Sequence, residues 1–398
     1  MHDTIRESNM DRENFNAIIT RFLDKFEVTN SKPSEEYFKW NAVACFQKNW
    51  NLEAADFAQM FSDAVKEFSV IIDTNYAAPV GGLKTLLKQP GEDEIIRAAF
   101  KELFAEDAGN IDQLQIRAER FVETVNERID YYWPGSHLYR QSLRSAVLFL
   151  SMRYPADNYI LFWSRAANWA TFVEFADDFG SGASFSLAKF YRMCDELRDE
   201  ILKSELLKKC NEERMRAAGV LTDDDYHIMV YDIIYCATCY HLYTDIPNYG
   251  ANVGERIQRS KDRTEIEKIK QTVAELEAQA KTSATLQKLP PELIGCAVEH
   301  KKFGQGIITE KTNTILRVRF GEELKGFLFP DAFEQKHLAL ADSTIMADMM
   351  AAIDSKKASS QVDKALNSAK EELEKIESAF NKKWKKGIHN GELDISDE

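Results

Sequence analysis

Three short runs of β-branched and aromatic residues constrain the fold of this 398-residue chain more than any other feature. They occupy residues 298–308, 314–320 and 326–330, and glycine and asparagine separate them. Runs of this length and composition predict a meander of short β-strands. Gly304 and Gly306 are expected to let the first strand kink or bulge, as the corner of a small barrel requires. The runs therefore predict a small β-barrel.

Helical periodicity predominates in the rest of the chain. Phe15, Ile18, Phe22 and Phe26 recur every three or four residues, which is the spacing of one helix face. The same pattern predicts helices over residues 82–88, 92–104, 111–131, 166–175, 186–208 and 224–242. The expected fold class is therefore mainly α with a small β-barrel (α+β).

One segment of the helical region carries a different signal. Apolar runs at residues 147–152 and 158–162 lie on either side of Pro155, Ala156 and Asp157. Two short apolar runs around a turn sequence predict a β-hairpin.

Changes in composition predict five parts along the chain. Residues 1–253 are expected to form a mostly helical recognition domain, and residues 254–291 a charged helical linker. Residues 292–341 are expected to form the β-barrel, residues 342–386 a C-terminal helical segment, and residues 387–398 a disordered tail.

The composition narrows the class of protein. Hydrophobic residues make up 44% of the chain and aromatic residues 11%, as in folded globular proteins. No apolar stretch approaches the roughly 20 residues of a membrane span, and the polar first residues do not resemble a signal peptide. Six scattered cysteines indicate reduced thiols rather than a disulfide scaffold. We therefore expect a cytoplasmic protein.

The charge distribution argues against broad attraction to nucleic acid. The net charge is −14, and residues 1–254 carry nearly all of the acidic excess, while residues 255–340 are slightly basic. An acidic protein repels phosphate backbones over most of its surface. Binding to nucleic acid would therefore require a local basic surface.

An aromatic-rich stretch at residues 37–50 and the later stretch 175–182 lie within the helical region. Together they resemble the segment found ahead of the motor domain in McrB-like, modification-dependent restriction GTPases. This resemblance implies a role in restriction or defence. The chain has no Gly-x-x-x-x-Gly-Lys-Ser/Thr loop, so the resemblance does not extend to nucleotide hydrolysis.

The β segment carries the pattern Val-x-His-x-x-Phe-Gly-x-Gly at Val298, His300, Phe303, Gly304 and Gly306. This pattern is similar to that of the SH3/Tudor-like barrels of UvrD-type helicases and CarD-type transcription regulators. The resemblance implies that the barrel contacts a protein partner and that the protein acts in genome maintenance.

Two sets of residues are candidate binding sites. Interleaved aromatic and arginine side chains suit unstacked bases, although the same residues could form the edge of an ordinary core. The candidate nucleic-acid-binding residues are Arg140, Arg144, Arg153, Trp163, Arg165 and Trp169. A basic edge of the barrel is either a partner surface or a strand edge protected by lysine. The candidate partner-binding residues are His300, Lys301, Lys302, Arg317 and Arg319.

Metal, phosphate and catalytic signatures are weaker. Cys236 and Cys239, with His227 and His241 nearby, could supply zinc ligands, but their apolar helical surroundings favour core packing. The loop at residues 180–184 could cradle a phosphate, but a helix N-cap explains it better. No catalytic triad or metal-nuclease cluster is recognisable. We therefore predict no metal, no cofactor and no catalytic residue.

These observations predict a non-enzymatic recognition or adaptor protein. It would bind a protein through the barrel, and nucleic acid is a second kind of partner. One alternative is a nuclease or nucleotide-processing effector whose site assembles from dispersed residues. The other is an oligomeric scaffold that associates through residues 255–281 and 361–384.

Overall fold

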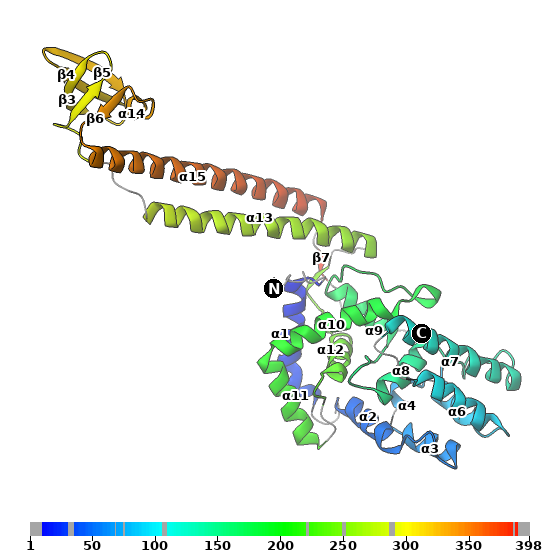
Figure 1. The fold of residues 1–398 in the computed structure, drawn as a ribbon. Coiled ribbons are helices and arrows are strands. Elements are labelled where there is room, and N and C mark those ends of the chain that lie inside the picture. The colour runs from blue at the N-terminus through cyan, green and yellow to red at the C-terminus, as the bar shows by residue number, and fades with distance from the viewer. Residues whose placement is uncertain are drawn as a thin grey trace. The chain divides into compact units, whose positions relative to one another are not determined.

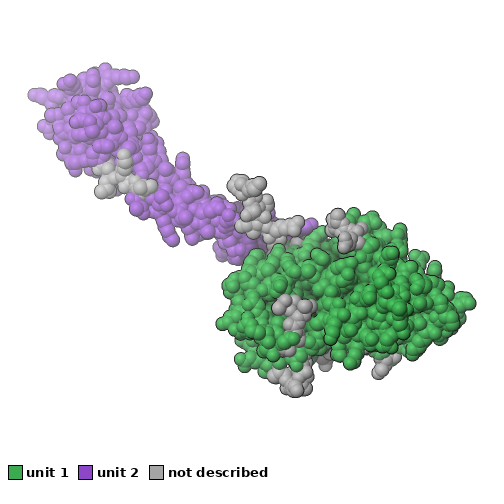
Figure 2. All heavy atoms as spheres, turned by 60° about the horizontal axis from the view of Figure 1, so that its bottom comes forward, with its two compact units in different colours: residues 1–260, 385–398 green, residues 261–384 purple. Residues whose placement is uncertain are grey.

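A computed structural model describes residues 10–30, 36–67, 69–74, 76–105, 110–219, 223–248, 252–285, 291–384 and 387–388. The chain divides into two compact units, which Figure 2 shows in different colours. Unit 1 comprises residues 1–260 and 385–398, and unit 2 comprises residues 261–384. Most of the expected linker (254–291) and most of the expected C-terminal segment (342–386) lie in unit 2. No helix of the described residues is long and apolar enough to cross a bilayer.

Unit 1 is built from helices (Figure 1). They are α1 (Arg12–Thr29), α2 (Phe38–Asn49), α3 (Phe57–Ala64), α4 (Ser69–Ile72), α5 (Pro79–Leu86), α6 (Glu92–Leu103), α7 (Ile111–Tyr132), α8 (Leu143–Arg153), α9 (Trp163–Phe172), the short 3-10 turn η1 (Gly182–Ser184), α10 (Leu187–Lys203), α11 (Glu205–Ala218) and α12 (His227–Cys239). The helices predicted at 82–88, 92–104 and 111–131 are confirmed. The single helix predicted at 186–208 is divided at Ser204, whose side chain caps α11 by accepting from the Leu207 N–H.

The predicted hairpin at residues 147–162 is wrong. Residues 143–153 form α8, and its buried stretch runs without interruption from Ser145 to Met152. A helix that is apolar on all sides has no 3.6-residue period, so a short apolar run does not distinguish a buried helix from a buried strand. Only the turn after the first run, at residues 155–157, was placed correctly.

The aromatic residues of the stretch 37–50 lie in the core of unit 1. Phe46 stacks on Trp50 with ring centroids 4.8 Å apart, and Trp50 meets Phe100 at 4.9 Å. Phe100 in turn contacts Phe149 of α8 at 5.0 Å. Core packing therefore explains the aromatic residues at 37–50, which are one part of the resemblance to restriction GTPases.

The chain leaves unit 1 and later returns to it. The first residues of α13 (Val253–Thr285) belong to unit 1, where buried Arg259 forms an ion pair with Glu174. After unit 2, β7 (Gly387–Ile388) pairs antiparallel with β1 (Pro247–Asn248). The expected tail, residues 387–398, therefore begins with two residues in a ladder, and residues 389–398 lie outside the described chain.

Two long helices of unit 2 run antiparallel to each other (Figure 1). They are α13 and α15 (Ser343–Lys383). Lys270 of α13 pairs with Glu377 of α15 at 3.2 Å, and Lys370 of α15 pairs with Glu277 of α13 at 2.6 Å. The segments proposed to drive oligomerisation thus pair with each other within one chain.

The remaining part of unit 2 is a five-stranded antiparallel sheet. Its strands are β2 (Ala297–His300), β3 (Gly304–Lys311), β4 (Ile315–Phe320), β5 (Glu323–Leu328) and β6 (Leu338–Leu340), and α14 (Asp331–Glu334) precedes β6. The strand order is β5-β4-β3-β2-β6. The α+β class is thus confirmed, but the sheet is open, with β5 and β6 at its edges, and its pairings do not close a barrel.

The sheet and the start of α15 share one core. Met349 and Ile353 of α15 pack with Val298, Leu316 and other apolar residues of the strands. We call residues 293–353 the sheet module. The register of β3 against β4 shifts between Ile308 and Glu310, which is a different position from the bulge expected at Gly304 and Gly306.

Candidate functional site

The outer sheet face is the surface of the sheet that points away from the core of the sheet module. Along β4 the even-numbered residues are buried, while Ile315, Arg317 and Arg319 are exposed. The register carries this alternation to β3 and β5, where Ile307 and Leu324 lie on the same face as Arg319. A period of two residues thus divides the sheet into a core face and an exposed face.

Four aliphatic side chains on this face are in contact with solvent. Ile307 is 53% exposed, Ile315 45%, Leu324 48% and Leu328 65%. Ile315 lies directly opposite Leu328 across the β4–β5 ladder. Single exposed aliphatic residues are ordinary, but four on one face of a small sheet form an apolar surface of the kind that binds partners.

Arg319 lies in the middle of these aliphatic residues. Its neighbour on β3 is Ile307 and its neighbour on β5 is Leu324. Among the described residues, no carboxylate forms an ion pair with Arg319, whereas Arg317 pairs with Glu310 at 3.3 Å. A guanidinium flanked by aliphatic side chains on the neighbouring strands can bind a carboxylate with two hydrogen bonds.

Gly326 leaves the middle of β5 without a side chain. It lies opposite Arg317, and a Cβ atom added to it would meet nothing within 4 Å. A glycine inside a strand often marks a place where another backbone approaches closely. Together, Ile307, Ile315, Arg317, Arg319, Leu324, Gly326 and Leu328 make up the candidate site.

The predicted partner-binding residues divide into two groups. Arg317 and Arg319 lie on the outer sheet face, but His300, Lys301 and Lys302 lie at the turn between β2 and β3. His300 is partly buried, and its Nδ1 accepts from the N–H groups of Lys302 and Phe303 at 3.0 and 3.3 Å. Its ring also stacks on Phe303 at 4.6 Å. His300 therefore holds the turn, and the structure does not bring all five residues to one surface.

The shared pattern Val-x-His-x-x-Phe-Gly-x-Gly has structural roles. Val298 is buried, and Gly304 has a positive φ of 71°. A Cβ atom on Gly306 would lie 2.7 Å from the ring of Phe320. The motif thus encodes the fold of the module, while the residues of the candidate site all lie after its positions.

Two of the predicted nucleic-acid-binding residues, Arg144 and Trp163, line a pocket of about 240 Å³ together with Phe162. Arg140 pairs with Asp130 at 2.6 Å, and Arg144 lies over the ring of Phe162 at 3.6 Å. Arg165 lies over the same ring at 5.2 Å and over Tyr235 at 4.7 Å. These guanidinium groups already have partners within unit 1.

The other members of that set also have internal roles. The Trp163 indole N–H donates to the Gly180 carbonyl at 2.9 Å, and Arg153 lies over the ring of Tyr154 at 4.9 Å. Trp169 is fully buried and meets Phe15 edge to face. A buried indole cannot stack on a base, so Trp169 belongs to the core.

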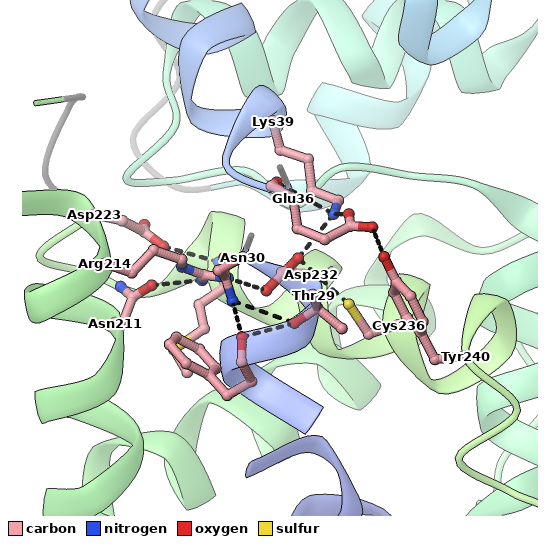
Figure 3. A network of polar contacts seen from close by, with 12 residues as sticks. Thr29, Asn30, Glu36, Lys39, Asn211, Arg214, Asp223, Asp232, Cys236 and Tyr240 are labelled. Atoms are coloured by element: carbon pink, nitrogen blue, oxygen red, sulfur yellow. Dashed lines mark hydrogen bonds and ion pairs between the residues drawn. The ribbon is translucent and has the colours of Figure 1, made fainter. Parts of the chain in front are cut away.

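A network of buried charges, which the sequence did not predict, lies in unit 1 (Figure 3). Lys39 of α2 contacts Glu36 and lies 2.8 Å from Asp232 of α12. Arg214 of α11 lies 2.8 Å from the other carboxylate oxygen of Asp232. Burial alone would favour neutral forms, but each charge faces an opposite one, so the pKa of Lys39 is raised and that of Asp232 is lowered.

The network also contains a set of atoms with the spacing of metal ligands. One atom each of Glu36, Asp232 and Cys236 lies within 4.8 Å of the others. The Lys39 ammonium, however, already binds both carboxylates. Burial also raises the pKa of the Cys236 thiol, which opposes the thiolate that a metal requires. The set therefore suits an internal lysine better than a metal ion.

Asp223 lies beside this network, and the pKa of its carboxyl group is unusual. Its carboxylate accepts from the backbone N–H groups of Met229 at 2.8 Å and Ile228 at 3.3 Å. Burial nevertheless raises its pKa to about 6. Nearby His227, also buried, has its pKa lowered to about 4, mainly by burial. Asp223 caps the start of α12, and it also lines a pocket of about 300 Å³ with Asn211 and Tyr226.

The glycine-serine loop at residues 180–184 precedes α10 and belongs to a helix N-cap. A Cβ atom on Gly180, which has a φ of +70°, would lie 2.2 Å from the Ser184 carbonyl oxygen. Ser186 caps α10 by accepting from the Lys189 N–H. Asp177 before the loop pairs with Arg192 at 2.7 Å. The loop is a tight turn and a helix cap.

A cavity of about 650 Å³ lies among α7, α8 and α10 and includes Asp157 and Asp195. Asp195 accepts from the Tyr159 hydroxyl at 2.7 Å, and the Tyr191 hydroxyl donates to Asn158 at 2.9 Å. Most polar groups around this space are thus bound within the chain. The described residues that line it do not include a nucleophile paired with a base, so it offers no recognisable catalytic centre.

The six cysteines are free thiols, and Cys236 and Cys194 are buried. Cys236 contacts the Asp232 carboxylate at 3.7 Å, and α12 is buried along most of its length. Core packing therefore accounts for the Cys-x-x-Cys pair better than zinc does. Comparison of the chain with protein-family models, curated proteins and solved structures finds no match.

Proposed function

We propose that this protein is a recognition or adaptor protein that acts by binding, and that the outer sheet face of unit 2 contacts a protein partner. The observation that carries the proposal is the position of Arg319 between Ile307 and Leu324, with Ile315 and Leu328 nearby. Arginine is enriched at the centres of protein interfaces, where it lies among buried apolar area.

The chemistry of the other candidate regions supports binding over catalysis. The charges of the buried network neutralise one another, and the polar groups of the 650 Å³ cavity are largely bound within the chain. By contrast, the outer sheet face presents apolar side chains to solvent, and burying each of them would contribute roughly 1 to 2 kcal/mol. A partner that covers this face would therefore gain affinity.

The resemblances supply the biological setting of the proposal. The motif that begins at Val298 suggests an SH3/Tudor-like module, and the order β5-β4-β3-β2-β6 is compatible with such a module. Restriction or genome maintenance in the cytoplasm is the setting that these resemblances favour. Nucleic-acid binding by unit 1 is a weaker part of the proposal, because Arg140 and Arg144 are engaged internally.

Co-purification from the native cell tests the proposal. The tagged full chain, the variant Arg317→Glu/Arg319→Glu and a control variant would be compared by quantitative mass spectrometry. The control, Lys356→Glu/Lys364→Glu, makes the same charge change at exposed positions of α15. A partner that disappears only with the face variant supports the proposal. An unchanged set of co-purifying proteins, with both variants folded by circular dichroism, would contradict it.

A further inference from the structure

We propose that the partner of the outer sheet face is the acidic segment at residues 391–397 of a second copy of this chain. This inference rests on the proposed function and names the partner. The proposed contact joins the face of one copy to the segment that follows β7 in another.

The segment has the chemistry that the face requires. It contains two aliphatic residues, Leu393 and Ile395, and three acidic ones, Glu392, Asp394 and Asp397. The face offers four exposed aliphatic side chains and two arginines. Aliphatic side chains of the segment would cover those of the face, and each of its carboxylates could accept two hydrogen bonds from a guanidinium group.

The alternation of the segment suits an extended strand. Leu393 and Ile395 are two positions apart, so in an extended chain they point to the same side, roughly 7 Å from each other. On the face, Ile315 and Leu328 form one aliphatic pair, and Ile307 and Leu324 flank Arg319. Gly326 lies between the Leu324 and Leu328 positions of β5 and would let the segment's backbone approach, since no atom lies within 4 Å of its missing Cβ.

The length of the chain favours a second copy over the same copy. Ile353 of α15 is part of the core of the sheet module. From Ile353 to Lys383 the helix rises about 45 Å, at about 1.5 Å per residue. An extended chain covers at most about 3.6 Å per residue, so Leu393 lies within about 36 Å of Lys383. Gly387 and Ile388 are also held by β1. Leu393 therefore falls short of its own module.

Sedimentation velocity of full-length protein, over protein concentrations from low to high micromolar, tests the inference. Wild-type chain is expected to self-associate. The face variant Arg317→Glu/Arg319→Glu and the segment variant Glu392→Lys/Asp394→Lys are each expected to weaken association at least tenfold. The control variants Lys356→Glu/Lys364→Glu and Glu371→Lys/Glu374→Lys change the same charges at exposed positions of α15 and are expected to associate like wild type.

Mixing the two weakened variants is the decisive measurement. The lysines of the segment variant would meet the glutamates of the face variant, so an equimolar mixture is expected to associate again. Circular dichroism and melting curves test whether each variant is folded. If Arg317→Glu/Arg319→Glu is unfolded, Arg319→Gln replaces it as a milder face variant. A mixture of folded variants that does not associate overturns the inference.

The failure of this inference is distinct from failure of the proposed function. If wild-type chain is monomeric but the face variant loses a co-purifying protein, the face binds another partner and only the inference falls. If the face variant changes neither self-association nor co-purification, both fall.

Discussion

The ammonium group of Lys39 lies 2.8 Å from the carboxylate of Asp232, and neither side chain has any exposed area. The two residues are 193 positions apart in the chain, so this ion pair joins α2 to α12. Arg214 and Glu36 complete the network. Removing one member of such a pair leaves a buried charge unpaired, which costs more than the pair itself contributes.

Lys39→Met is therefore expected to lower the free energy of unfolding by about 3 to 5 kcal/mol. The reason is that Asp232 would keep only Arg214 as its cationic partner in the core. Urea unfolding of unit 1, followed by tryptophan fluorescence, measures the change. Lys189→Met is the control, because Lys189 pairs with Asp177 at the surface at 3.2 Å and should cost less than about 1 kcal/mol. Equal losses for the two variants would contradict the structural role of the Lys39 pair.

The stability of unit 1 is expected to depend on pH through two buried groups of opposite sign. The pKa of Asp223 is raised to about 6, so its contribution to stability is present at low pH and is lost as the pH rises through about 6. The pKa of His227 is lowered to about 4, so its contribution is present above about 6.5 and is lost as the pH falls through about 4.

Between pH 4 and 6 the two contributions oppose each other in the wild-type protein. In His227→Gln only that of Asp223 remains, so the free energy of unfolding should fall as the pH rises across this window, relative to wild type. In Asp223→Asn the free energy of unfolding should instead rise with pH across the same window, relative to wild type. Urea unfolding at half-unit pH steps measures both slopes. Identical slopes in the two variants would show that these groups do not titrate as proposed.

Gly306→Ala is expected to destabilise the sheet module by about 1 to 3 kcal/mol. The added methyl group would lie 2.7 Å from the Phe320 ring and 2.8 Å from a Val318 methyl group, which is closer than packed atoms allow. Gly326→Ala is the control in the same sheet, because its methyl group would meet nothing within 4 Å. Thermal melting monitored by circular dichroism should separate the two variants, and a Gly326→Ala loss as large as that of Gly306→Ala would refute this account.

His300 and Arg319 are expected to have separable roles, although both were predicted to bind the partner. His300→Ala removes the acceptor of two backbone N–H groups and should destabilise the sheet module by about 1 to 3 kcal/mol. Arg319→Ala removes an exposed group on the outer sheet face and should change stability by less than about 0.5 kcal/mol, while it weakens partner binding. Melting curves and co-purification of both variants measure the separation. A stable His300→Ala that loses the partner would place His300 in the binding surface instead.

The sequence predicted the strands and amphipathic helices well because their signal is local. The alternation along β4 follows directly from residues 315–320, and the helices at 92–104 and 111–131 follow from the spacing of their apolar residues. The hairpin prediction failed at α8, where burial on all sides removed the period on which the prediction relied.

Of the candidate sites, the sequence identified Arg317 and Arg319 but not the aliphatic residues around them. Ile307, Leu324 and Leu328 belong to other strands, and only the register between strands shows that they share the exposed face with Arg319. A one-residue shift in pairing would reverse the two faces. Asp232 did carry a signal, since a carboxylate inside the apolar run of α12 requires a buried partner, but nothing local identifies that partner as Lys39.

By itself the sequence determined which segments form strands and helices, because backbone periodicity depends on residues two to four positions apart. Only the tertiary structure decided which charges meet in the core of unit 1 and which side chains surround Arg319. Those neighbours come from strands and helices that are distant in the chain, and the free energy of burying or pairing them depends on where the complete fold brings them together.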